Sequence, residues 1–190
     1  RTPYKWLNIW ALLQTLLQQQ NPNNELVAVK FFTADVIANL ATHGAASVSA
    51  QQIYWRALQA SGVEVIRGVH CLTPTAMPRH HPQFPQKYDD LVDVWKLEEK
   101  QTDVNLALHL YHDAVCGACD QVVLCSNDMD LMPALKLVYE TLQTQIGIIF
   151  PRRSETARPA SKGPSQYAHW ARSHVLSDEP ARHQFPKNVV

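Results

Sequence analysis

Short runs of β-branched and aromatic residues alternate with longer segments of helical periodicity along most of the chain. Strands are expected at residues 26–32, 63–70, 90–97, 121–125 and 145–150. Helices are expected at residues 6–18, 47–60, 102–115 and 128–142. This alternation favours crossover connections between parallel strands. We therefore expect an α/β fold, a three-layer α/β/α sandwich with a mostly parallel central sheet.

The segments outside this alternation are expected to be loops, a short helix and a tail. Residues 72–88 contain four prolines and no period, which indicates a long loop. A basic loop is expected after Pro151, and residues 166–174 are expected to form a last short helix. We interpret residues 1–175 as one domain and residues 176–190 as a C-terminal tail.

Composition excludes several classes of protein. With 190 residues and 46% hydrophobic content, the chain is long enough to bury one sizeable core. Its formal net charge of zero argues against coating nucleic acid by bulk charge. No uncharged apolar run is long enough to span a membrane, and no signal peptide is recognisable. The 4 cysteines are too few for a disulfide scaffold, so we expect a reducing, cytoplasmic location.

Acidic residues follow two of the expected strands. Asp128 and Asp130 come after the strand at 121–125, while Glu99 and Asp103 come after the strand at 90–97. The carboxyl ends of parallel strands form the ligand crevice, so these side chains are expected at one edge. Clustered carboxylates suit Mg²⁺ or Mn²⁺, which can activate water against a phosphodiester. The same acids also suit helix caps, and the pattern alone leaves both interpretations open.

At these residues the chain resembles the NYN domain family, nuclease-like domains of PIN-like fold. The specific segments are EEKQTDVNLALHL at residues 98–110 and SNDMDL at residues 126–131. Weaker similarity extends to TPYKWLN near the start, FFTADV at residues 31–36 and QFP near the end. The resemblance spans nearly the whole chain, and it implies a PIN-like fold and a metal-dependent endoribonuclease that hydrolyses RNA with Mg²⁺ or Mn²⁺.

The resemblance also implies roles for single residues. Asp103 and Asp128 would bind the metal, Asp130 would bind it directly or through water, and Glu99 would be a further catalytic acid. The residues expected to contact RNA are Ser126, Asn127, Lys100, Arg152 and Arg153. The alternative is a module of the same fold that has lost full metal binding and serves to bind RNA or a protein.

Two departures from the family pattern bear on this hypothesis. Family members begin with a strand that ends in a phrase like DGFN and supplies a metal ligand, whereas no such strand precedes TPYKW here. Its loss would expose two strand edges, so we expect it upstream of residue 1; Asp35 is only a weak substitute. The second departure is Met129, an apolar residue where a small one is usual.

Three other features have weaker interpretations. Cys116 and Cys119 have the spacing of a zinc or redox pair, although zinc would need two further ligands. Basic residues after the last strand, with Tyr167 or Trp170 as a stacking surface, could follow an RNA backbone. The tryptophans on apolar helical stripes are expected in the core: Trp6, Trp10 and Trp55.

Overall fold

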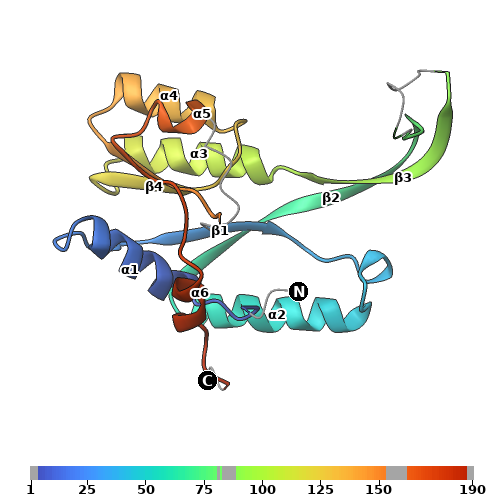
Figure 1. Ribbon diagram of the computed structural model, residues 1–190, viewed down its shortest axis with the longest axis horizontal. Helices are drawn as coiled ribbons and strands as arrows, with labels where there is room; N and C mark the ends of the chain where they lie inside the picture. The colour runs from blue at the N-terminus through green and yellow to red at the C-terminus, as the bar shows by residue number, and fades with distance from the viewer. Residues whose placement is uncertain (1–3, 81, 83–88, 153–161, 188–190) are drawn as a thin grey trace.

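The computed structural model describes residues 4–80, 82, 89–152 and 162–187, and it shows a mixed α/β fold with two small sheets (Figure 1). The first sheet has the order β1-β2-β3, formed by Val29–Ala34, Val63–Pro78 and Leu91–Lys100. The second has the order β4-β5-β6, formed by Gln121–Cys125, Gln145–Ile149 and Trp170–Arg172. A single central sheet between two helical layers is therefore not confirmed.

The second sheet is parallel throughout, whereas the first is mixed. β1 and β2 run parallel, while β2 and β3 run antiparallel. In the described residues β1 and β4 do not pair, so each sheet ends at one of these strands. The additional strand expected from the sequence stays a prediction, as does the division at residue 175.

Helices lie on both sides of the sheets. In the view of Figure 1, α1 (Ile9–Gln20) and α2 (Ala45–Ala60) lie below them. Above them lie α3 (Thr102–Val115) and α4 (Met132–Thr141). Shorter helices complete the described fold: η1 (Ala38–Leu40), α5 (Lys162–Ser165) and α6 (Asp178–Arg182). No helix in the described part of the chain has the length and apolarity needed to cross a bilayer.

Two helices connect the sheets to one another. α1 packs Leu13 against the core below β1 and β2, and Leu12 and Leu16 against Ile149 of β5. On the other side, α3 buries Leu110 against the second sheet and also contacts β1. The two sheets are therefore held in place by shared helices rather than by strand pairing.

The strands β2 and β3 form a long hairpin that projects from the body (Figure 1). They pair from Val69 with Lys100 to Pro78 with Leu91. The expected loop at 72–88 is therefore wrong for residues 72–78, which continue β2; residues 81 and 83–88 lie outside the described ranges. β1 accompanies β2 only as far as Gly68, so one edge of β2 is open beyond that point. An open edge tolerates the prolines that made this segment look like a loop.

Two other expected elements differ from the structure. The helix expected at residues 166–174 is wrong, because Trp170–Arg172 forms β6 beside β5. Gly147 of β5 has no side chain, and the Trp170 ring occupies the space that a Cβ would need. The helix expected from Asp128 begins instead at Met132 as α4. The remaining expected strands and helices are confirmed, with shifted ends.

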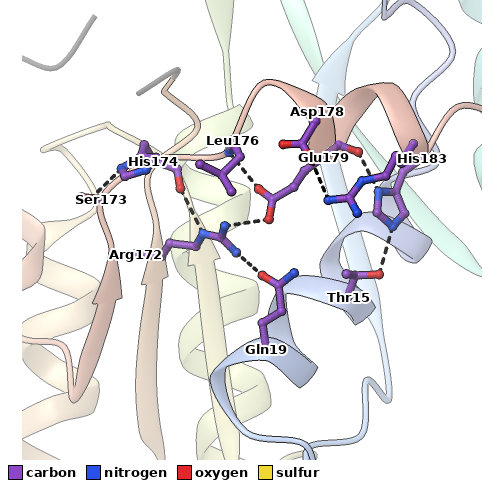
Figure 2. A network of polar contacts seen from close by, with 10 residues as sticks. Thr15, Gln19, Arg172, Ser173, His174, Leu176, Asp178, Glu179 and His183 are labelled. Carbon is purple, nitrogen blue, oxygen red and sulfur yellow. Dashed lines mark hydrogen bonds and ion pairs between the residues drawn. The ribbon is translucent and has the colours of Figure 1, made fainter. Parts of the chain in front are cut away.

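The C-terminal segment is fixed by a buried carboxylate (Figure 2). Glu179 is fully buried, and its Oε1 accepts a hydrogen bond from Nη2 of Arg172 at 2.7 Å. Its Oε2 accepts the backbone N–H of Leu176 at 2.8 Å. Arg172 also donates to Oε1 of Gln19 on α1 at 2.8 Å. The network therefore ties α6, β6 and α1 together.

The residues after α6 hold the start of the chain in place. The carbonyl of His183 accepts a hydrogen bond from the N–H of Asn8 at 2.7 Å. The ring Nε2 of His183 lies 2.9 Å from the Thr15 hydroxyl (Figure 2). The N–H of Phe185 donates to the carbonyl of Trp6 at 2.7 Å. The position of Trp6 therefore depends on the segment that Glu179 anchors.

Candidate functional site

The structure brings four of the expected site residues together, and we call Glu99, Asp103, Asp128 and Asp130 the acidic edge. Asp103 lies in the first turn of α3, directly after β3, and Asp128 and Asp130 lie in the loop after β4. The pKa of Asp103 is raised, first by partial burial and then by the negative charges of the other three. The acidic edge therefore holds a carboxyl group that keeps its proton to higher pH than usual.

Each of the other acids also has a local structural contact. The N–H of Asp128 donates to Oγ of Ser126 at 3.0 Å, and the N–H of Asp130 donates to Oδ1 of Asp128 at 2.9 Å. Glu99 accepts the hydroxyl hydrogen bond of Thr102, the first residue of α3. Such side-chain contacts shape turns and explain why α4 starts late.

The residues expected to contact RNA have partners of their own. Nζ of Lys100 lies 3.4 Å from Glu98, which also pairs with Lys96 at 2.8 Å. The hydrogen bond from Lys96, helped by Lys100, holds the pKa of Glu98 below its usual range. Nε of Arg152 donates to Oδ1 of Asn127 at 3.1 Å. Arg153, like Arg158, lies outside the described residues.

The expected metal centre is wrong. Within the described ranges, no group of three or more His, Cys, Asp or Glu side chains is placed to hold a metal ion. The carboxylates of Glu99 and Asp128 accept hydrogen bonds from their own loops, so they influence Asp103 by charge without converging on one point. The prediction that Asp103, Asp128 and Asp130 bind Mg²⁺ or Mn²⁺ is therefore wrong.

A pocket on the other side of β1 was not anticipated from the sequence. We call it the aromatic pocket; it has a volume of about 270 Å³ and is lined mainly by Lys5, Trp6, Phe31, Thr33, Tyr54 and Trp55. Trp55 is buried as expected, but the expected core position of Trp6 is wrong, since 38% of this residue is exposed at the pocket wall. No local motif marks the pocket, because its walls come from three separate segments.

Tyr54 of α2 organises the aromatic wall. Its hydroxyl donates to the carbonyl of Leu7 at 2.8 Å. Its ring meets the rings of Trp6, Phe31 and Phe185 edge-on, with centroids 6.1, 6.5 and 6.4 Å away. Burial raises the pKa of Tyr54 to about 12, so the hydroxyl stays neutral at physiological pH. The aromatic wall is therefore apolar and uncharged, and Tyr54 is held by its hydroxyl at Leu7 and by the rings around it.

Gln51 fixes the same helix to the end of β1. Its Nε2 donates to the carbonyl of Ala34 at 2.9 Å, and its Oε1 accepts the N–H of Val36 at 2.8 Å. Both ends of the amide are thus used to hold α2 beside β1. The pocket floor and its helical wall therefore form one rigid unit.

The acidic edge and the aromatic pocket lie on opposite sides of the same strands. In β1, Phe31 and Thr33 line the pocket, whereas Lys30 binds Asp113 of α3 at 2.7 Å on the other face. The start of α3 packs closely on Gly68, the register partner of Ala34. Both regions therefore adjoin the carboxyl end of the β1–β2 pair without sharing a residue.

The turns after β1 and β4 lack the glycines with which many α/β folds bind a dinucleotide. The chain contains no G-x-G-x-x-G pattern, and residues 35–37 after β1 and 126–131 after β4 contain no glycine. Glycines at such a turn allow a backbone to approach a pyrophosphate. These turns therefore do not fit that mode of dinucleotide binding.

One curated protein is similar to almost the whole chain. It is 6-hydroxy-3-succinoylpyridine 3-monooxygenase HspA of Pseudomonas putida (strain DSM 28022 / S16), which is 34% identical over 206 aligned positions. The alignment covers 99% of this chain and 65% of the relative, so the chain spans slightly less than two thirds of that protein. No protein-family model matches the chain, and no solved structure matches it significantly.

This comparison contradicts the function expected from the resemblance. The relative is named a monooxygenase, and no family model supports an NYN domain. The NYN assignment, the ribonuclease activity and the hydrolase chemistry derived from it are therefore wrong. The two acidic segments that suggested them lie at the ends of strands and beginnings of helices, where short polar residues also form turns and caps.

Proposed function

We propose that this chain takes part in the monooxygenation of a small hydroxylated aromatic compound. The observation that carries this proposal is the 34% identity to 6-hydroxy-3-succinoylpyridine 3-monooxygenase along 99% of the chain. The aromatic pocket supports it independently, because its size and apolar walls suit a single aromatic ring.

The reaction class fixes what must be supplied. A monooxygenation places one atom of O₂ in the substrate, while the other atom is reduced to water. The balance requires two electrons and two protons for each turnover. We propose a reduced nicotinamide or flavin as the electron donor. The turns after β1 and β4 do not fit the usual dinucleotide-binding pattern.

We propose that the acidic edge handles protons in this reaction. Asp103 is the candidate group, since partial burial and its acidic neighbours favour the protonated form. Because it lies across the strands from the aromatic pocket, it would exchange protons with the reaction through solvent and not by contact with the substrate. Asp128, Asp130 and Glu99 would act on the reaction through Asp103, by their charge. This role is independent of the metal binding that was expected for the same residues.

Three expectations from the sequence stay proposals: the three-layer arrangement, the contact with RNA and the cytoplasmic location. A three-layer arrangement is supported by α1 and α3, each of which contacts both sheets. RNA contact through Lys100, Ser126, Asn127 and Arg152 stays a prediction, and a gel-shift titration of the purified protein would test it. The cytoplasmic location likewise stays a prediction, which fractionation of the source cells would test.

Turnover with labelled oxygen tests the proposed function. The purified protein is incubated with 6-hydroxy-3-succinoylpyridine, NADH or NADPH, and FAD or FMN under isotopically heavy oxygen gas. We expect an oxygenated product that carries one heavy oxygen atom, with none formed without oxygen or with heat-denatured protein. Product that takes its oxygen from water, or no product with any donor, would contradict the proposal.

A further inference from the structure

We infer that the aromatic pocket is a recognition site for a single aromatic ring that carries a carboxylate on a short side chain. This inference rests on the proposed function for its choice of ligand class. The pocket itself is a separate observation, because its lining residues belong to the start of the chain, β1 and α2 and include none of the acidic edge.

The walls favour a flat apolar group. The rings of Trp6 and Phe31 both meet the Tyr54 ring edge-on at the pocket, and Trp55 lines it from α2. Aromatic rings prefer offset-stacked and edge-to-face neighbours, and a ligand ring can add to such a cluster. An aliphatic ligand of equal size would gain burial without this geometric preference.

The pocket offers room for one ring system. Pockets for drug-sized ligands measure roughly 300–1,000 Å³. At about 270 Å³, the aromatic pocket falls just below that range. A substituted pyridine or benzene fits this hollow, and because it is largely open to solvent, a side chain on the ring can extend past the rim.

One cation gives the pocket its charge preference. Lys5 is exposed, and among the lining residues that the structure describes it is the only ionisable cation. Tyr54 remains neutral, and Gln51 already uses both ends of its amide for β1 and Val36. An anionic group of the ligand would therefore pair with the Lys5 ammonium, and Thr33 adds a hydroxyl that can donate to a polar substituent.

The pocket is also held ready before a ligand arrives. Trp6 is fixed by the Phe185 N–H, Tyr54 by the Leu7 carbonyl, and α2 by Gln51. Fixed walls reduce the ordering cost of binding, so a small ligand can reach useful affinity.

Binding is measured without oxygen or a reductant, so that recognition is separated from turnover. 6-Hydroxy-3-succinoylpyridine is titrated into the protein by calorimetry and by tryptophan fluorescence, since two of the 5 tryptophans line the pocket. A matched compound, 3-acetyl-6-hydroxypyridine, keeps the ring and ketone and lacks the carboxylate.

Two variants separate the charge from the ring. We expect Lys5→Gln to weaken binding of the acid about threefold, as for loss of an ion pair at an exposed position, and to leave the acetyl compound nearly unaffected. Trp6→Ala should weaken both compounds. Lys136→Gln is the control, because this exposed lysine lies on α4 and pairs with Glu140. Lys5 is exposed, so its variant stays informative even if Trp6→Ala does not fold.

Each outcome decides one claim. No binding of the acid by the wild-type protein, or affinities of Lys5→Gln and Trp6→Ala within about twofold of wild type, would overturn the pocket assignment. Binding with the expected variant effects but no turnover would support the pocket and count against the proposed function. Turnover by the wild-type protein combined with unchanged ligand affinity in both variants would support the proposed function and overturn the pocket assignment.

Discussion

The acidic edge and the aromatic pocket adjoin the same end of β1 and β2 but are built in different ways. The acidic edge comes from short stretches around Asp103 and Asp128, and its charge is largely exposed to solvent. The aromatic pocket combines residues from three distant segments and is fixed by hydrogen bonds at Tyr54 and Gln51. Local polar clusters are easy to find in a sequence, whereas rigid recognition surfaces depend on tertiary structure.

The largest effect should come from breaking the buried ion pair that anchors the pocket's outer wall. Arg172→Met leaves Glu179 buried without its partner, and we expect a loss of about 3–5 kcal/mol in the free energy of unfolding. Urea denaturation measures this loss, and ligand titration should show a weakened pocket.

Asp178→Asn is the matched control, because it removes the exposed ion pair between Asp178 and Arg182 on the same helix. It should cost at most about 0.5 kcal/mol. Equal losses in the two variants would show that the Glu179 network is not what fixes this segment.

The second prediction concerns turnover at the acidic edge. Asp103→Asn should lower the rate by less than about tenfold while leaving ligand affinity unchanged, because Asp103 lies across the strands from the pocket and exchanges protons only through solvent. Steady-state kinetics and calorimetry measure the two effects. Asp120→Asn, at the opposite end of β4, is the control. Full activity in Asp103→Asn would leave the pocket as the only functional candidate of the two.

The third prediction uses the close packing beneath the acidic edge. In Gly68→Ala, the new Cβ would lie 2.6 Å from the carbonyl oxygen of Lys100 and would also collide with the Thr102 hydroxyl. The start of α3 must then shift, at a cost of about 1–3 kcal/mol in unfolding free energy. Thermal unfolding measures it.

The double variant Gly68→Ala/Thr102→Ala removes the hydroxyl and leaves the carbonyl in place. It should therefore recover only part of the loss. A single variant as stable as wild type would mean that α3 is not held by this contact.

The fourth prediction is a smaller effect within the pocket. Tyr54→Phe removes the hydrogen bond to Leu7 and should cost about 1 kcal/mol. Denaturant unfolding measures the cost, and Tyr139→Phe at a more exposed position is the control. A cost no larger than that of the control would show that this hydrogen bond does not stabilise the wall.

The smallest expected effect is a pH dependence of stability. Because the pKa of Asp103 is raised on folding, the folded chain binds more protons than the unfolded chain between the ordinary and raised values. The contribution of the Asp103 carboxyl group to the free energy of unfolding is therefore lost as pH rises through that window. The melting temperature of Asp103→Asn should rise relative to that of wild type as the pH increases from acidic toward neutral. A constant difference across this range would contradict the raised pKa.

The sequence predicts most individual elements because their signals are local. The short apolar run at residues 121–125 and the helical periodicity at 102–115 identify β4 and α3 correctly, and the strand-end rule anticipates the cluster around Asp103. The patterns fail where tertiary contacts decide. Pro74 lies in a strand because one edge of β2 is open, and Trp170 lies in a strand because Gly147 leaves room for its ring.

Function was harder to predict than fold for a related reason. Acidic residues at strand ends serve both metal sites and turns, and only the placement of their carboxylates distinguishes the two uses. Trp6 was expected in the core because its apolar neighbours are local in sequence. Its ring partner Tyr54 and its backbone partner Phe185 are both far away in sequence. Neither ambiguity could be resolved from spacing alone.

The projecting hairpin of β2 and β3 changes how the molecule moves through water. A compact chain of this length has a radius of gyration of about 16 Å. A ribbon that extends from the body adds frictional drag and long interatomic distances at little cost in mass. In dilute solution the protein should therefore diffuse more slowly than a sphere of its mass, and its small-angle scattering should show an asymmetric distance distribution with an extended tail.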